Sequence, residues 1–295
     1  LKKLIFFIFV LYPTGLIYSA EKNVEQINDI EVKPSDFNPT TSIKGTTYFT
    51  FGALDSEELS ESFNFSYENK FRIKSSFSGS DTLTTVIESG NAFNSPLSLD
   101  LQSKKGDFLK ISELHYKFSV GKDSNITIGP KMFGYIGLAG QSTVYNERIA
   151  ILDGSNYTTS AGLGPGLAFS SNKKNGLNYS VKLASSSIEI NDETKHIMAQ
   201  VGLTKENLGG TITANTNDDF DAYGIALYYK SDKFPSISAS IEEKETKSSV
   251  KSINWLIGSQ KKFNKKTLGL AIGTHNEQEK IAYESWCTFD INDKL

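Results

Sequence analysis

The stretch SFNFSYENKFRIKS, residues Ser62–Ser75, decides the fold class of this chain. Its aromatic and aliphatic residues occupy every second position from Phe63 to Ile73, and polar or charged residues stand between them. A β-strand places alternate residues on opposite faces, whereas the 3.6-residue period of a helix would mix the two sets. Strands of soluble sheets usually have about 5–6 residues, and about 9–11 tilted residues cross a bilayer. The stretch therefore predicts a long strand with one apolar face.

The same alternation recurs along the rest of the chain. Further apolar stripes begin at residues 43, 114, 126, 163, 177, 197, 208, 223, 237, 253, 268 and 281, and a strand is expected at 82–90. These stripes indicate about fourteen strands, and no helical stretch of any length separates them. The expected fold class is all-β, as a transmembrane antiparallel β-barrel. A soluble up-and-down barrel and a soluble secreted sandwich are the alternatives, although a sandwich rarely needs so many long strands.

The connections between the stripes alternate in length and in charge sign. One set is mostly longer and acidic, as in Ala53–Glu61 and Ser185–Lys195, and the other is shorter and rich in lysine, as in Ser171–Asn175 and Lys261–Lys266. Bacterial outer-membrane barrels have long extracellular loops and short periplasmic turns. We therefore expect the acidic connections outside the cell and the lysine-rich turns in the periplasm.

Composition excludes several other classes of protein. The chain has 295 residues, of which 38% are hydrophobic and 12% aromatic, and it carries a formal net charge of −3. A helical membrane protein needs runs of about 20 apolar residues, a disordered chain has few aromatic residues, and a nucleic-acid-binding domain is usually basic. None of these fits, so nucleic acid is not an expected partner.

The residues give no sign of catalysis. A single cysteine and three scattered histidines offer no metal site, and the sequence lacks the motifs of serine hydrolases, zinc proteases and phosphate-binding loops. We expect no enzyme activity, no cofactor and no metal. A barrel without a channel, acting as an adhesin or a structural protein, remains the alternative to a channel.

The N-terminal segment has the pattern of a secretory signal peptide. Lys2 and Lys3 precede an apolar run that ends at Tyr18, and small residues follow before Glu21. The expected domains are a signal peptide at 1–20, a short periplasmic segment at 21–41 and the barrel at 42–295. The mature chain is therefore expected in a bacterial outer membrane.

Several short motifs resemble the carbohydrate-selective porin (OprB-like) family, in its cyanobacterial branch. They are FNPTT at 37–41, GSDTLTT at 79–85 leading to GN at 90–91, and LHYKFSVG at 114–121 running into NITIGP at 125–130. The resemblance covers residues 37–293 loosely. It implies a 16-stranded outer-membrane channel for carbohydrates or inorganic ions. Outer-membrane lipid surrounds such a channel, small sugars or ions permeate it, and a homo-oligomer is possible.

Two features depart from that family. Many cyanobacterial members carry an N-terminal domain that binds cell-wall polymer, and residues 21–41 leave no room for it. The family also runs two more strands beyond the point where this sequence stops. The chain is therefore expected to lack its C-terminal strands, with a smaller closed barrel of fourteen strands as the alternative.

The longest connection, Phe133–Ser160, is the third of the long set, which is the place of the constriction loop in general porins. Its charged candidates for the constriction are Glu147, Arg148 and Asp153. The next strand, 161–169, carries glycine and alanine opposite its leucines. Two interpretations stay open: the loop presses against this wall, or the small residues widen the lumen.

Charged residues of the early strands share the polar face. Fixed charges lining a pore set its ion preference, so these residues are the candidates for lining the channel. By alternation alone the expected pore-lining residues are Lys44, Lys70, Arg72, Lys74, Glu113, His115, Lys117, Lys131 and Lys182, with Glu68 and Glu88 as further acids.

Overall fold

The computed structural model describes residues 39–53, 63–91, 108–145, 152, 157–159, 163–186, 195–264, 266–274 and 281–289. The expected signal peptide and nearly all of the expected periplasmic segment lie outside these residues. Fourteen strands form one antiparallel sheet whose spatial order is the chain order, from β1 to β14. The prediction of an all-β fold with about fourteen strands is therefore confirmed.

The strands are long, as the alternation predicts. The stretch that decided the fold class is β2, and the strand expected at 82–90 is β3. The bounds are β1 Thr40–Ala53, β2 Phe63–Ser76, β3 Asp81–Gly90, β4 Lys110–Ser119, β5 Ser124–Phe133, β6 Leu163–Ser171, β7 Gly176–Ser185, β8 Lys195–Lys205, β9 Leu208–Thr216, β10 Phe220–Tyr229, β11 Ser236–Thr246, β12 Lys251–Phe263, β13 Lys266–Thr274 and β14 Ile281–Phe289.

The two ends of the sheet differ less in loop length than expected. Strands β9 to β12 run further than the stripes indicated, so only residues 217–219 and 247–250 remain in two connections that were expected to be long. The β10–β11 turn, at 230–235, is longer than either. The end that carries the β2–β3, β4–β5 and β6–β7 turns is called the short-turn end below.

The distribution of apolar and polar side chains is the reverse of that in a soluble protein. Large apolar side chains on one face are exposed, for example Ile212 and Leu227 at 61% each and Leu270 at 63%. Polar side chains on the other face are buried, for example Thr213 and Asn254. Soluble proteins rarely expose such continuous apolar surface, whereas lipid-facing strands alternate in this way.

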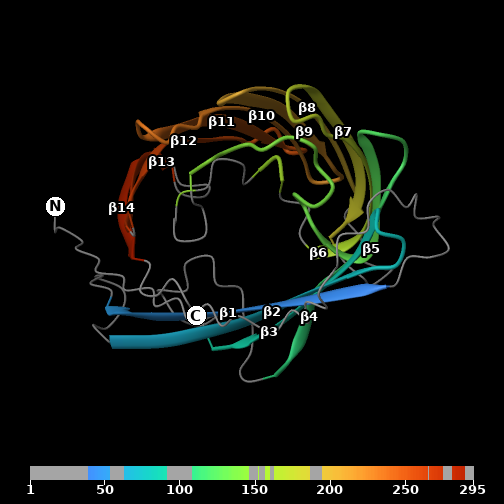
Figure 1. The fold of residues 1–295 in the computed structure, drawn as a ribbon. Helices are drawn as coiled ribbons and strands as arrows, with labels where there is room; N and C mark the ends of the chain where they lie inside the picture. The colour runs from blue at the N-terminus through green and yellow to red at the C-terminus, as the bar shows by residue number, and fades with distance from the viewer. Residues whose placement is uncertain are drawn as a thin grey trace.

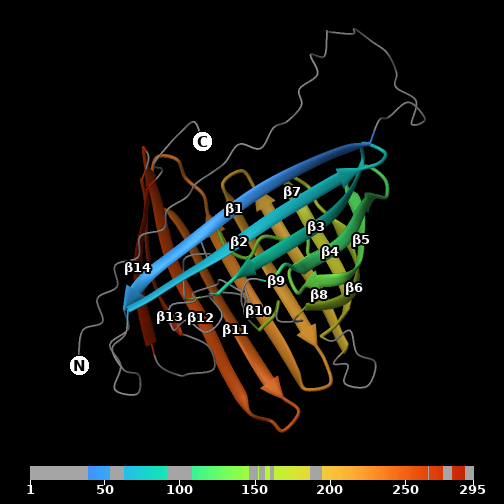
Figure 2. The same cartoon turned by 90° about the horizontal axis from the view of Figure 1, so that it is seen from below.

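The sheet curves into a ring (Figure 1). Its inner face is the polar one, because buried polar side chains such as Ser180 and Gln200 bind the chain inside the ring. Both views bring the end of β1 near β14 (Figure 2), and these two strands are the edges of the sheet. Among the described residues no backbone ladder joins these two edges. In the same part of the chain, no helix has the length and apolar character needed to cross a membrane.

Bulges in β4 and β5 change which residues face inward. The β4–β5 register shifts between Leu114 and Tyr116, and the β5–β6 register shifts between Gly129 and Met132. Met132 is consequently buried on the inward face, and Lys131 pairs with Leu114. The Lys131 ammonium donates to the carbonyl of Ile111 at 2.9 Å. Lys131 therefore leaves the inward set in which strict alternation had placed it, because each bulge adds an unpaired residue.

Candidate functional site

The chain after β5 turns into the ring and follows its inner wall (Figure 1). We call residues 134–145, 152 and 157–159 the lumen segment. Its start is fixed by Lys182 of β7, a fully buried lysine whose ammonium donates to the carbonyls of Phe133 at 2.6 Å and Gly134 at 3.0 Å. A buried cation without carbonyl partners would be costly, so this lysine and the segment stabilise each other.

The middle of the lumen segment lies against β6, β7 and β8. The amide of Ala139 donates to the Ser180 hydroxyl at 3.0 Å, and the amide of Gly140 donates to Gln200 Oε1 at 2.5 Å. Gly137 has φ +88°, and a Cβ built on it would lie 2.4 Å from the Cβ of Ala168. Glycine is required here both for the backbone angle and for the close approach.

Further along, Glu284 of β14 holds the segment through two contacts. Its carboxylate accepts hydrogen bonds from the Tyr145 hydroxyl at 2.7 Å and from the Leu152 amide at 3.4 Å. The indole of Trp286 donates to the same hydroxyl at 2.8 Å. Tyr145, Leu152 and Trp286 form a small buried cluster with Leu256, so the segment packs on the wall as well as bonding to it.

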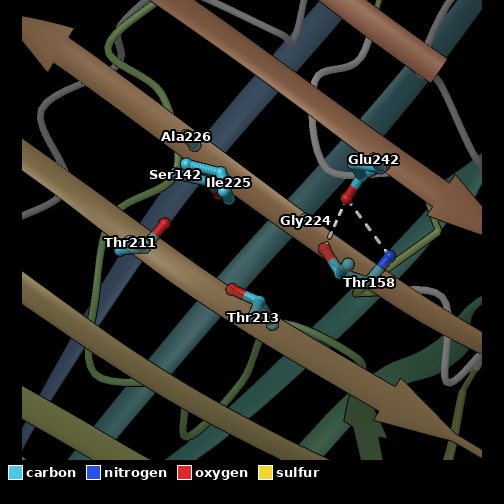
Figure 3. A pocket seen from close by; sticks show the side chains of 8 residues that line it. All are labelled: Ser142, Thr158, Thr211, Thr213, Gly224, Ile225, Ala226 and Glu242. Carbon is cyan, nitrogen blue, oxygen red and sulfur yellow. Dashed lines mark hydrogen bonds between the residues drawn. The ribbon is translucent and has the colours of Figure 1, made fainter.

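A second carboxylate, Glu242 of β11, binds the segment at 157–159. It accepts the amide of Tyr157 at 3.0 Å, the amide of Thr158 at 3.2 Å and also the Thr158 hydroxyl. Figure 3 shows Glu242 joined to Thr158 by two of these bonds, beside a small cavity lined mainly by small or polar residues such as Thr211. Hydrogen bonds to an ionised acceptor are stronger than neutral ones. Glu242 and Glu284 therefore act as anchors of the lumen segment.

The described contacts of the lumen segment fall on the wall from β6 to β14, and the inward face of β1–β4 carries paired charges. The Lys70 ammonium lies 2.8 Å from Glu88, and the Arg72 guanidinium lies 3.0 Å from Glu113. The register places Val86 of β3 between Arg72 and Glu113. Val86 is fully buried, so the side chain of Arg72 spans a whole strand to reach its partner.

Three other lysines of this wall are exposed and form no ion pair with the residues that the structure describes. Lys44 pairs in register with Arg72, Lys74 with Thr84, and Lys117 with Thr82, which places all three on the inward face. His115 pairs with Thr84, next to them. The structure thus brings together eight of the nine expected pore-lining residues on one face of the ring. Lys182 is among them but is covered by the lumen segment.

Other expectations are partly resolved. Glu147, Arg148 and Asp153 lie outside the described residues. Of the two interpretations of strand 161–169, the contact of Gly137 with Ala168 supports a loop pressed against the wall. Within the parts of the chain that the structure describes, no group of three or more His, Cys, Asp or Glu side chains is placed to hold a metal ion.

Sequence reasoning missed the anchors of the lumen segment. Ser238, whose hydroxyl accepts the amides of Val144 at 2.9 Å and Tyr145 at 3.2 Å, was not singled out, and neither were Glu242 and Glu284. One signal existed for Glu242: it interrupts the small polar residues on the inward face of β11.

Comparison with solved structures places this fold among porins. A variant of the Rh. blastica porin superposes with a TM-score of 0.60 at 11% identity, covering 86% of this chain and 91% of that chain. Salmonella typhi OmpF in complex with daunomycin gives a TM-score of 0.60 at 10% identity, covering 85% and 86%. No protein-family model matches the chain, and no curated protein matches it in sequence. At these identities the likeness establishes the fold.

Proposed function

We propose that the chain is a porin, a water-filled channel through which small solutes diffuse passively across a bacterial outer membrane. The observation that carries this proposal is the lumen segment, anchored inside a ring whose outer face is apolar and whose inner face is polar. A segment in that position narrows the lumen, and its described hydrogen bonds to the wall fall between β7 and β14. A lumen that is lined by charge and narrowed at one level is the arrangement that sets size and ion preference in a pore.

Conductance in planar bilayers tests the proposal. The chain, refolded in detergent and shown to be folded by its heat-dependent shift in gel mobility, should insert and give discrete current steps. The control is the same preparation unfolded by heat before addition. Folded protein that inserts and yields no steps would contradict the channel and favour a barrel acting as an adhesin or a structural protein.

We further infer that the permeants are carbohydrates or inorganic ions, as the OprB-like and cyanobacterial resemblance implies. Liposome swelling in isotonic sugar distinguishes them, because an uncharged sugar that enters carries water with it. Swelling in small sugars that fails in larger ones would support a carbohydrate channel. Conductance without swelling would restrict the permeants to ions.

The same proposal places residues 1–20 as a cleaved signal peptide, residues 21–41 as a periplasmic segment and the long connections outside the cell. Ser248 lies in the β11–β12 turn and Lys173 in the β6–β7 turn, at opposite ends of the ring, and both are exposed. In a Cys287→Ser background, Ser248→Cys should react with an impermeant thiol reagent on intact cells and Lys173→Cys should not. The reverse result would invert the orientation.

A homo-oligomer also belongs to this proposal. The outward face of β1 and β2 carries hydrogen-bonded polar pairs, from Thr47 to Asn69 at 2.8 Å and between Thr41 and Ser75 at 2.9 Å. Such pairs interrupt the apolar outer surface of these two strands. If this face meets a second copy of the chain, crosslinking in outer membranes should yield a discrete multimer. If it meets lipid, Asn69→Leu should leave the channel folded.

A further inference from the structure

The inward face of β1–β4 is divided into a balanced half and a basic half. Toward the end opposite the short turns, cations and acids occur in equal number, and four of them form the two ion pairs described above. Lys110 also belongs to this half, because its register partner is Glu88. The charged residues of the balanced half are Glu68, Lys70, Arg72, Glu88, Lys110 and Glu113.

The basic half lies toward the short-turn end. It begins at Lys44, which is level with Arg72 in the register, and continues toward the short turns with Lys74 and Lys117; all three are exposed. In the part of the chain that the structure describes, none of these three side chains forms an ion pair or a hydrogen bond. Lys74 and Lys117 both lie close enough to His115 to interact with it electrostatically, so they face the same region of the lumen.

An acid of β3 at this end, Asp81, is engaged in the β2–β3 turn. Asp81, at the start of β3, is only 5% exposed and pairs in register with Phe118. Its carboxylate accepts hydrogen bonds from the Tyr116 hydroxyl at 2.6 Å, from the Ser78 amide at 2.8 Å and from the Ser76 hydroxyl at 2.8 Å. Asp81 therefore closes the β2–β3 turn, and its register with Phe118 places it on the opposite face of the sheet from Lys117.

Unpaired ammonium groups in a water-filled lumen attract anions and repel cations. The field of such groups extends about 10 Å at 0.1 M salt and about 30 Å at 0.01 M. In the balanced half the fields of the paired charges largely cancel. Among the described residues, the basic half is therefore the part of the β1–β4 inward face where no acid offsets the positive field.

We propose that Lys44, Lys74 and Lys117 form an anion-collecting zone at the short-turn end of the lumen. It favours small inorganic anions, such as chloride and phosphate, over cations of similar size. This inference rests on the proposed channel function and assigns its charge preference to three residues. The ion pairs of the balanced half contribute little to that preference.

Reversal potentials in salt gradients test the zone. A KCl gradient of about 0.1 M against about 0.01 M makes the field long on the dilute side. The wild-type channel should prefer chloride, and more strongly when the short-turn end faces the dilute solution. The variant K44Q/K74Q/K117Q should lose both the chloride preference and its dependence on gradient direction. Potassium phosphate should give the same ordering of the channels.

A matched control variant distinguishes the effect of charges inside the lumen from that of charges at the mouth of the channel. The variant K122Q/K173Q/K174Q removes the same charge from exposed turns at the same end, and its reversal potential should stay close to wild type. An unchanged reversal potential in K44Q/K74Q/K117Q, in channels that conduct, would overturn the zone. An equal shift in both variants would also overturn it. A wild-type chain that never conducts would refute the channel itself.

Discussion

The two sides of the ring use their carboxylates differently. On β2–β4, Glu88 and Glu113 pair with cations of the same wall, so charge is balanced between side chains. On β11 and β14, Glu242 and Glu284 accept hydrogen bonds from amides and hydroxyls of the lumen segment. The described contacts of the lumen segment fall on the second wall and not on the first.

This difference shows how one inward alternation of polar residues can serve two purposes. A carboxylate beside a lysine or an arginine on a neighbouring strand finds a partner within the sheet. A carboxylate among serine, asparagine and glycine, as Glu242 is, keeps oxygen lone pairs free to accept hydrogen bonds from a segment of chain that passes over it. Neighbours on adjacent strands, and not the acid itself, decide the role.

The largest expected effect comes from removing both anchors. In E242Q/E284Q each carboxylate becomes an amide whose NH₂ group cannot accept the amide protons it faces. Hydrogen bonds to charged groups contribute about 1.5–3 kcal/mol each. We expect noisy, fluctuating open-channel currents and a lower temperature for the heat-dependent gel shift, because the segment is no longer held.

The neighbouring residue supplies the control for that experiment. Glu243 points to the opposite face, its side chain is 47% exposed, and it pairs with Lys251 at 2.9 Å. Glu243→Gln removes the same type of charge without touching the lumen segment and should leave current noise unchanged. Quiet currents in E242Q/E284Q would show that the segment is held by packing alone.

A smaller effect is expected where the segment touches β6. Gly137→Ala adds a Cβ at φ +88° that meets Ala168, whereas Gly121→Ala adds one at φ +81° with nothing within 4 Å. The backbone strain alone costs about 1 kcal/mol. Gly137→Ala should therefore lower the free energy of unfolding by clearly more than Gly121→Ala does, as measured by urea titration in detergent micelles. Equal losses of unfolding free energy in the two variants would mean that the lumen segment moves away from Ala168 at little cost.

The smallest effect should come from the charged wall. Arg72 is 33% exposed on its side chain and Glu113 is 2% exposed, so water screens their attraction in part. A double-mutant cycle with Arg72→Gln and Glu113→Gln should give a coupling of about 1 kcal/mol in the same titration. A coupling energy above about 1.5–3 kcal/mol, the contribution expected of each anchor hydrogen bond, would reverse the comparison between the two walls.

Much of the fold could be predicted because its signal is local. The alternation in β2 and its repeats fixes strand type, strand number and the lipid-facing stripe, since a period of two is a property of neighbouring residues. Bulges could not be predicted in this way. One extra residue in β5 moves Lys131 out of the inward set and Met132 into it, and no pattern within the strand marks the insertion.

The candidate site also has some features that local sequence predicts and others that depend on tertiary structure. The sequence by itself determined which face is polar and that lysines and acids crowd the inward face of the early strands. Only the tertiary structure decided which of them are paired, because Arg72 and Glu113 are 41 residues apart and meet through strand register. The path of the lumen segment was likewise decided in three dimensions. Tyr145 and Glu284, 139 residues apart, come within bonding distance only when the sheet curves round to bring β14 to the segment.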